Sequence, residues 1–125
     1  MHHGIPKEQL ADLLATADIG LMTVRPTPIL ELNCANKFFD YLASGLPIAL
    51  NYGGWQARTL EQTGSGLAAR MGDQDGFVAL IRGLACAPER REEMSGNARR
   101  TAEQRFDRDR IVAGIVEVIE TLPDD

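Results

Sequence analysis

The chain has 125 residues, of which 44% are hydrophobic and 25% are charged, a composition typical of one globular domain with its own core. Its formal net charge of −5 argues against a nucleic-acid partner, because phosphate binding requires a basic surface. No apolar run is as long as a membrane span, and the two cysteines, Cys34 and Cys86, lie far apart in no CxxC pattern, which favours a reduced cytoplasmic protein.

The first half of the chain alternates helical patterns with short apolar runs. "IGLMTV", "PIALN" and "GLAARM" indicate strands, and each follows a segment of helical periodicity. The two prolines of "RPTPILELN" forbid regular structure there, and Asn33 is the predicted N-cap of the helix that follows. The expected elements are a helix over residues 7–16, a strand over 19–24, a helix over 36–44, a strand over 47–51, a helix over 56–62 closed by Gly64, and a strand over 66–71.

The second half, after Gly72, is predicted to be helical. The first of its three helices has either Asp73 or Asp75 as N-cap, Pro88 fits the first turn of the second, and Asp107 caps the third. Each helix carries an apolar stripe at helical spacing. The stripes consist of Phe77, Leu80, Ile81 and Leu84 in the first helix, of Met94, Ala98 and Ala102 in the second, and of Ile111, Ile115, Val118, Ile119 and Leu122 in the third.

This order of elements predicts the fold class. Strands that alternate with helices form a parallel sheet with crossover helices. We therefore expect an α/β fold, a partial Rossmann-like parallel sheet of three strands followed by a C-terminal helical segment. Such sheets bind ligands outside the carboxyl ends of their strands. The loop after residue 24, the start of the helix at Asn36 and the turn "NYGGW" all lie at that edge.

The helix in "NKFFDYLASG" has a compact polar side near its start. At about 100° per residue, Asn36, Lys37 and Asp40 fall on one side, opposite Phe38 and Leu42. The simplest interpretation is a solvated face with a Lys37–Asp40 ion pair, which would contribute only about a few tenths of a kcal/mol. The position at a helix N-terminus, where free N–H groups attract anions, and at the ligand-binding edge of the sheet favours a ligand site.

The chain contains, in this order, the segments "ADIGLMTVRP", "NKFFDYLASGLPIALNYGG", "GSGLAARMGDQDGFVALIRGL" and "NARRTAEQRFDRDRI". Together they resemble the donor-binding domain of retaining GT-B glycosyltransferases, the group often called glycosyl transferases group 1. The resemblance runs from about Gly4 to Leu122 in the order and spacing of that family. It implies that residues 1–125 are a single C-terminal, Rossmann-like donor-binding fragment of a two-domain enzyme.

The resemblance also implies site residues. The family signature E-G-F-G-L-x-x-x-E precedes A-x-x-x-G-x-P, whose glycine and proline match Gly45 and Pro47. Asp40 stands at the second acid, which in the family hydrogen-bonds the ribose hydroxyls of the nucleotide. Lys37 would add a positive charge beside the diphosphate, a role suggested by its position alone. The turn whose backbone amides approach the diphosphate matches Asn33, Cys34, Ala35 and Asn36.

The chain departs from the signature at its first acid. Leu32 occupies that position, and Glu31 lies one residue earlier. Because this acid contacts the sugar hydroxyls in the family, Glu31 is the candidate sugar contact if the two-proline loop shifts by one residue. Gly53 and Gly54 are candidate lining residues of the crevice, and Trp55 is predicted to be a packing residue.

The function implied by the resemblance is transfer of a sugar from a nucleoside diphosphate sugar to an acceptor hydroxyl with retention, in surface polysaccharide or glycoconjugate synthesis. It implies no metal or other cofactor, and it implies an N-terminal acceptor domain as partner, with peripheral membrane contact through that domain. We expect the isolated chain to be inactive as a transferase. We also expect it to self-associate through the open, apolar edge of the strand over residues 19–24.

Two alternatives fit part of the pattern. One is a non-catalytic nucleotide-binding or interaction module of Rossmann-like fold. The other is a phosphorelay receiver domain, which shares the α/β alternation, but the acidic cluster that metal-assisted phosphorylation needs after the first strand is missing from this sequence.

Overall fold

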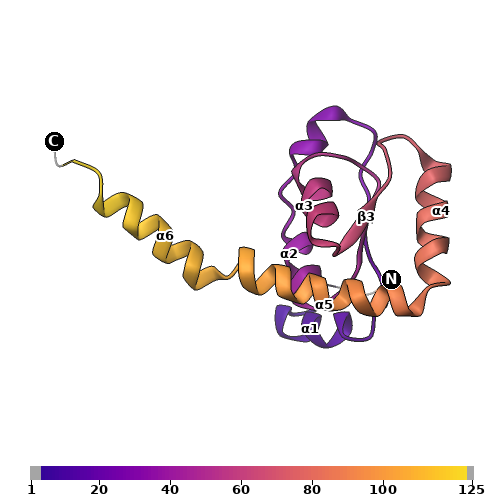
Figure 1. Ribbon diagram of the computed structural model, residues 1–125, viewed down its shortest axis with the longest axis horizontal. Coiled ribbons are helices and arrows are strands. Elements are labelled where there is room, and N and C mark those ends of the chain that lie inside the picture. The colour runs from indigo at the N-terminus through magenta and orange to yellow at the C-terminus, as the bar shows by residue number, and fades with distance from the viewer. Residues whose placement is uncertain (1–3, 124–125) are drawn as a thin grey trace.

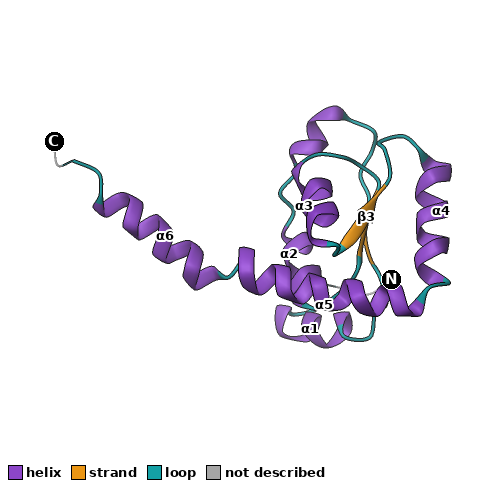
Figure 2. Cartoon of the chain, viewed as in Figure 1, coloured by secondary structure: helices purple, strands orange, loops and turns teal. Residues whose placement is uncertain are grey.

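The computed structural model describes residues 4–123, and its elements alternate between helix and strand before the chain becomes helical (Figure 2). The elements are α1 (Lys7–Leu14), β1 (Gly20–Met22), a 3-10 helix (Pro28–Leu32), α2 (Asn36–Ala43), β2 (Ile48–Leu50), α3 (Trp55–Thr63), β3 (Gly66–Ala68), α4 (Gln74–Ala85), α5 (Pro88–Arg105) and α6 (Arg108–Glu120).

The three strands form one parallel sheet in the order β1-β2-β3. Gly20 pairs with Ile48, and Ile48 pairs with Gly66. A side chain at position 66 would collide with the main chain of Ile48, so glycine is needed there for close strand pairing. The expected α/β fold with a three-stranded parallel sheet is confirmed.

Helices cover both faces of this sheet. Figure 1 shows α2 and α3 on one face and α4 on the other. Successive residues of a strand point to opposite faces, and β2 divides in this way. Ile48 and Leu50 join a core cluster with Phe38 of α2 and Leu60 of α3. Ala49 instead packs with residues of α4 and α5, namely Leu84 and Met94.

Helix α5 closes the end of the domain that lies opposite the carboxyl ends of the strands (Figure 1). Its polar side chains donate hydrogen bonds to carbonyl groups where the three preceding helices end, groups that have no partner within their own helix. The bonds are Arg91 Nη1 to Leu84 O at 2.6 Å, Asn97 Nδ2 to Gly64 O at 3.1 Å and Arg99 Nη1 to Ala43 O at 2.6 Å. This helix thereby fixes α2, α3 and α4 relative to one another.

Two expectations about the loop before α2 are wrong. The two-proline segment contains a 3-10 helix, Pro28–Leu32, which begins with the proline; the fixed φ of proline suits a first helical turn, where its missing N–H is not needed. Asn33 does not cap α2, because the N-cap position is occupied by Ala35. The carbonyl of Asn33 instead accepts a hydrogen bond from the indole of Trp55.

The predicted end residues of three helices are confirmed. Asp73, not Asp75, caps α4 by accepting a bond from Gly76 N at 2.8 Å, and Asp107 caps α6 through Arg110 N at 2.9 Å. Gly64 ends α3 with φ of +65°, a left-handed conformation that favours glycine. Each strand is shorter than its apolar run, three residues in every case.

Helix α6 extends away from the rest of the molecule (Figure 1). The whole of α6 is exposed. Its predicted apolar stripe is present, but Ile115 is 54% exposed and Ile119 is 60% exposed. The stripe thus faces solvent in this structure.

Candidate donor-binding site

Helix α2 begins at the carboxyl edge of the sheet with an N-terminus that no side chain of residues 4–123 caps. The N-cap residue is Ala35, in an extended conformation with φ −75° and ψ 134°, and it has no side-chain acceptor. The first N–H groups of a helix have no partner within the helix. Those of Asn36 and Lys37 lie in an exposed turn. Such a helix start is suited to bind an anion.

Lys37 and Asp40 lie one turn apart on α2 and are not paired with each other. Among residues 4–123 the structure holds one ion pair, from Arg99 Nε to Glu103 Oε1 at 2.7 Å. The ion-pair interpretation of the polar side of α2 is therefore wrong. Lys37 is exposed and Asp40 is half-buried, so both charged groups are accessible beside the uncapped N-terminus.

Glu31 and the two candidate glycines come together at the start of α3. A side-chain carbon at Gly53 would lie 3.0 Å from the Glu31 carboxylate, and one at Gly54 would collide with the Glu31 carbonyl. Gly54 also has φ of +90°, which strongly favours glycine. The 3-10 helix and the turn before α3 therefore pack backbone to backbone. Leu32, at the position of the signature acid, is 73% exposed.

Of the side chains that follow β2, that of Trp55 hydrogen-bonds the Asn33 segment, and those of Tyr52 and Gln56 hydrogen-bond each other. Trp55 Nε1 donates to Asn33 O at 3.0 Å. The hydroxyl of Tyr52 donates to Gln56 Oε1 at 2.6 Å. Burial raises the pKa of the Tyr52 hydroxyl above its ordinary value of 10.0, and a hydrogen bond from the Asn33 side chain partly offsets this. Tyr52 and Gln56 were not predicted as site residues from the sequence. The available signal was a polar aromatic two residues after a buried strand and four residues before an amide.

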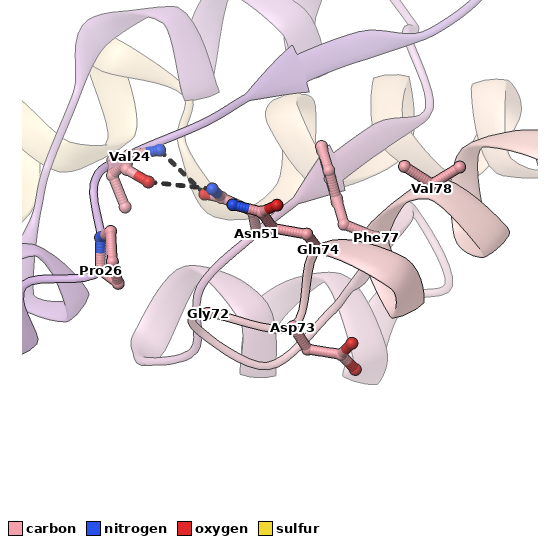
Figure 3. Close-up of a pocket in the computed structure, with 8 residues that line it drawn as sticks. All are labelled: Val24, Pro26, Asn51, Gly72, Asp73, Gln74, Phe77 and Val78. Atoms are coloured by element: carbon pink, nitrogen blue, oxygen red, sulfur yellow. Dashed lines mark hydrogen bonds between the residues drawn. The ribbon is translucent and has the colours of Figure 1, made fainter.

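A cavity of about 310 Å³ lies at the carboxyl ends of the strands on the side of α4 (Figure 3). Asn51 shapes it, because its side chain both accepts from Val24 N at 2.8 Å and donates to Val24 O at 2.9 Å. The Asp73 carboxylate is turned away from Asn51 in Figure 3, since it caps α4. The lining residues are Val24, Pro26, Asn51, Gly72, Asp73, Gln74, Phe77 and Val78.

The predicted site residues thus form two groups at the same edge of the sheet. Asn33, Ala35, Asn36, Lys37 and Asp40 belong to the entry and first turns of α2. Glu31, Gly53 and Gly54 meet at the start of α3. Cys34 and Cys86 are both exposed. Within residues 4–123 no cluster of three or more metal-ligating side chains is present, and no helix in that range has the length and apolar character needed to cross a membrane.

The family model described as "Glycosyl transferase-like" matches residues 1–117. Neither the curated proteins nor the solved structures include a match to this chain. The matched range contains all three strands, helices α1 to α5 and both groups of candidate site residues. The chain therefore belongs to the glycosyl transferase-like family, and the general activity associated with it is glycosyl transfer.

Proposed function

We propose that this chain is the donor-binding part of a retaining glycosyltransferase of the GT-B type, and that it binds a nucleoside diphosphate sugar. In this role it would act with an acceptor-binding domain, on the cytoplasmic side, in the synthesis of surface polysaccharide or glycoconjugates. The family match and the resemblance in four segments support the proposal.

One observation carries the proposal. The start of α2 combines an uncapped N-terminus with Lys37 and Asp40, which are free of each other, at the carboxyl edge of a parallel sheet. A nucleoside diphosphate offers complementary groups, since phosphate oxygens accept from backbone N–H groups and ribose hydroxyls donate to a carboxylate. The N–H groups of residues 34–36 and the ammonium of Lys37 would bind the diphosphate, and Asp40 would bind the ribose.

The same arrangement suits the chemistry of transfer. Breaking the bond between the sugar and the diphosphate leaves negative charge on the departing diphosphate. Preorganised N–H donors and a cation stabilise that charge as it develops. Glu31, beside Gly53 and Gly54, would hydrogen-bond the sugar hydroxyls from the neighbouring turn.

The experiment is a nucleotide titration of the wild-type chain and of Asp40→Ala, followed by the fluorescence of Trp55, the chain's only tryptophan. UDP, GDP and ADP are each tested, because the sequence does not specify the base of the donor nucleotide. Loss of a charge-assisted hydrogen-bonded pair is expected to weaken binding about tenfold to a hundredfold. Asp75→Ala, an exposed carboxylate on α4, is the matched control and should bind like wild type. Equal affinities for Asp40→Ala and wild type would remove Asp40 from the site.

A second candidate is a nucleotide-binding module without transferase activity. It is favoured by Leu32, which stands exposed where the family signature has its sugar-contacting acid. In this case nucleotide binding through α2 would persist, and a nucleoside diphosphate sugar would bind no more tightly than the corresponding nucleoside diphosphate. Comparing the two affinities separates the candidates.

A further inference from the structure

We propose that Tyr52, Trp55 and Gln56 are positioning residues that hold the Asn33–Asn36 turn in its binding conformation. The inference rests on the proposed donor site, but its structural half can be measured without any ligand. None of these three side chains belongs to the predicted donor contacts, and each lies on the segment that joins β2 to α3.

The turn has little main-chain support of its own. Asn33 N donates to Leu30 O at 3.1 Å, and Phe38 N donates to Ala35 O at 3.0 Å. Between these bonds the backbone is extended at Asn33 and at Ala35. A segment of this kind keeps one conformation only when neighbouring groups hold it, so its shape depends on partners outside the loop.

Tyr52 provides the first link. Its side chain is fully buried, and its hydroxyl donates to Gln56 Oε1 at 2.6 Å. Ala35 of the turn packs against the core cluster that contains Tyr52 and Phe38. Tyr52 therefore supports the turn from the core, and its hydroxyl is fixed by Gln56.

Trp55 provides the second link. Its indole N–H donates to the Asn33 carbonyl at 3.0 Å, so the main chain of Asn33 is held from the β2–α3 segment. The ring is fixed in turn by aromatic contacts with Phe38 and Phe39 of α2, at centroid distances of 5.4 Å and 6.2 Å. The indole thus bridges the turn and the first turn of α2.

Gln56 holds the Tyr52 hydroxyl from within the core. The residue is 1% exposed, and its Nε2 has no hydrogen-bond partner among the described residues. The bond to Tyr52 is therefore the side-chain hydrogen bond that holds this amide. A buried amide with a spare donor is costly. A buried amide that fixes the Tyr52 hydroxyl is consistent with a positioning role, since preorganisation of the first contacts depends on the residues behind them.

The test compares Tyr52→Phe and Trp55→Phe with wild type by amide hydrogen exchange. Both variants keep an aromatic ring and remove one donor. We expect exchange at the Asn33 and Phe38 amides to rise about threefold to tenfold, as fits the loss of one hydrogen bond. The Ala69 amide, which donates to Leu50 O in the sheet, should be unchanged. The matched control is Tyr41→Phe, whose hydroxyl makes only a 3.5 Å contact with Leu21 O; it should alter none of these amides.

Nucleotide titration of the same variants completes the test, and it is followed by calorimetry because Trp55→Phe removes the chain's only tryptophan. The proposal predicts weaker binding of UDP, GDP or ADP in Tyr52→Phe and Trp55→Phe, in proportion to the exchange at Asn33 and Phe38. Unchanged exchange at those two amides, or an equal rise at Ala69, would show that the residues only support the core and would overturn the proposal. Faster local exchange in a chain that binds no nucleotide would refute the donor site and leave the positioning of the turn intact. Gln56→Leu, which removes the acceptor of the Tyr52 hydroxyl, should reproduce the Tyr52→Phe exchange pattern.

Discussion

At the scale of single residues, the candidate site depends on backbone positions that only certain residues can occupy. Gly54 combines a φ of +90° with direct contact against the Glu31 carbonyl. Ala35 leaves the first turn of α2 without a side-chain acceptor. The glycine brings the Glu31 and Asn33 segments against the start of α3, and the alanine leaves the N–H groups of that turn accessible to a ligand.

Gly54→Ala is predicted to lower the free energy of unfolding by about 2 kcal/mol or more, because it adds both backbone strain and a collision with Glu31. Gly72→Ala is the matched comparison, since Gly72 has a similar φ of +85° but open space around the added carbon. It should cost only the strain, about 1 kcal/mol. Urea unfolding of both variants measures the difference, and equal losses would show that the Gly54–Glu31 contact contributes nothing.

At the scale of elements, the sequence predicts the type and order of the six α-helices and three strands among the described residues, because apolar periodicity reports which faces are buried. The 3-10 helix Pro28–Leu32 has no such signal and was not predicted. The sequence predicts the caps less well. Asp107 and Gly64 act through neighbours in the chain and are predicted correctly, and Asp73 is one of the two caps expected for α4. Asn33 is a residue type that often caps helices, but here its carbonyl accepts a hydrogen bond from the indole of Trp55. No local sequence pattern contains that contact.

The bonds from α5 to the ends of earlier helices belong to the same class of long-range contact. Asn97→Ala removes the donor to Gly64 O and should lower the free energy of unfolding by about 1 kcal/mol. Gln104→Ala, an exposed change on the same helix, should have almost no effect. If the two variants unfold at the same urea concentration, the bond to the end of α3 is not stabilising.

At the scale of the whole molecule, two apolar surfaces face solvent. Strand β1 lies at one edge of the sheet with Leu21 43% exposed, and the stripe of α6 is exposed along its length. Open strand edges and contiguous apolar faces favour association. The α6 surface also shows a limit of prediction from sequence. Its apolar stripe predicts a buried face, but the sequence does not predict which surface covers that face.

We propose that the isolated chain self-associates through the β1 edge, and we expect light scattering coupled to size exclusion to show a mass that rises with concentration. Leu21→Lys should shift the chain toward monomer, because a charge on an edge strand opposes pairing. Ile119→Lys tests α6 in the same way and separates the two surfaces. A wild-type chain that stays monomeric at high micromolar concentration would contradict self-association.

Backbone NMR shifts during titration with UDP, GDP and ADP test whether the start of α2 binds the donor nucleotide. We expect the shifting amides to cluster at residues 33–37 and around Asp40, with smaller changes at Gly53 and Gly54. Shifts that cluster instead on α4, α5 or α6, with residues 33–40 unchanged, would contradict donor binding at the start of α2.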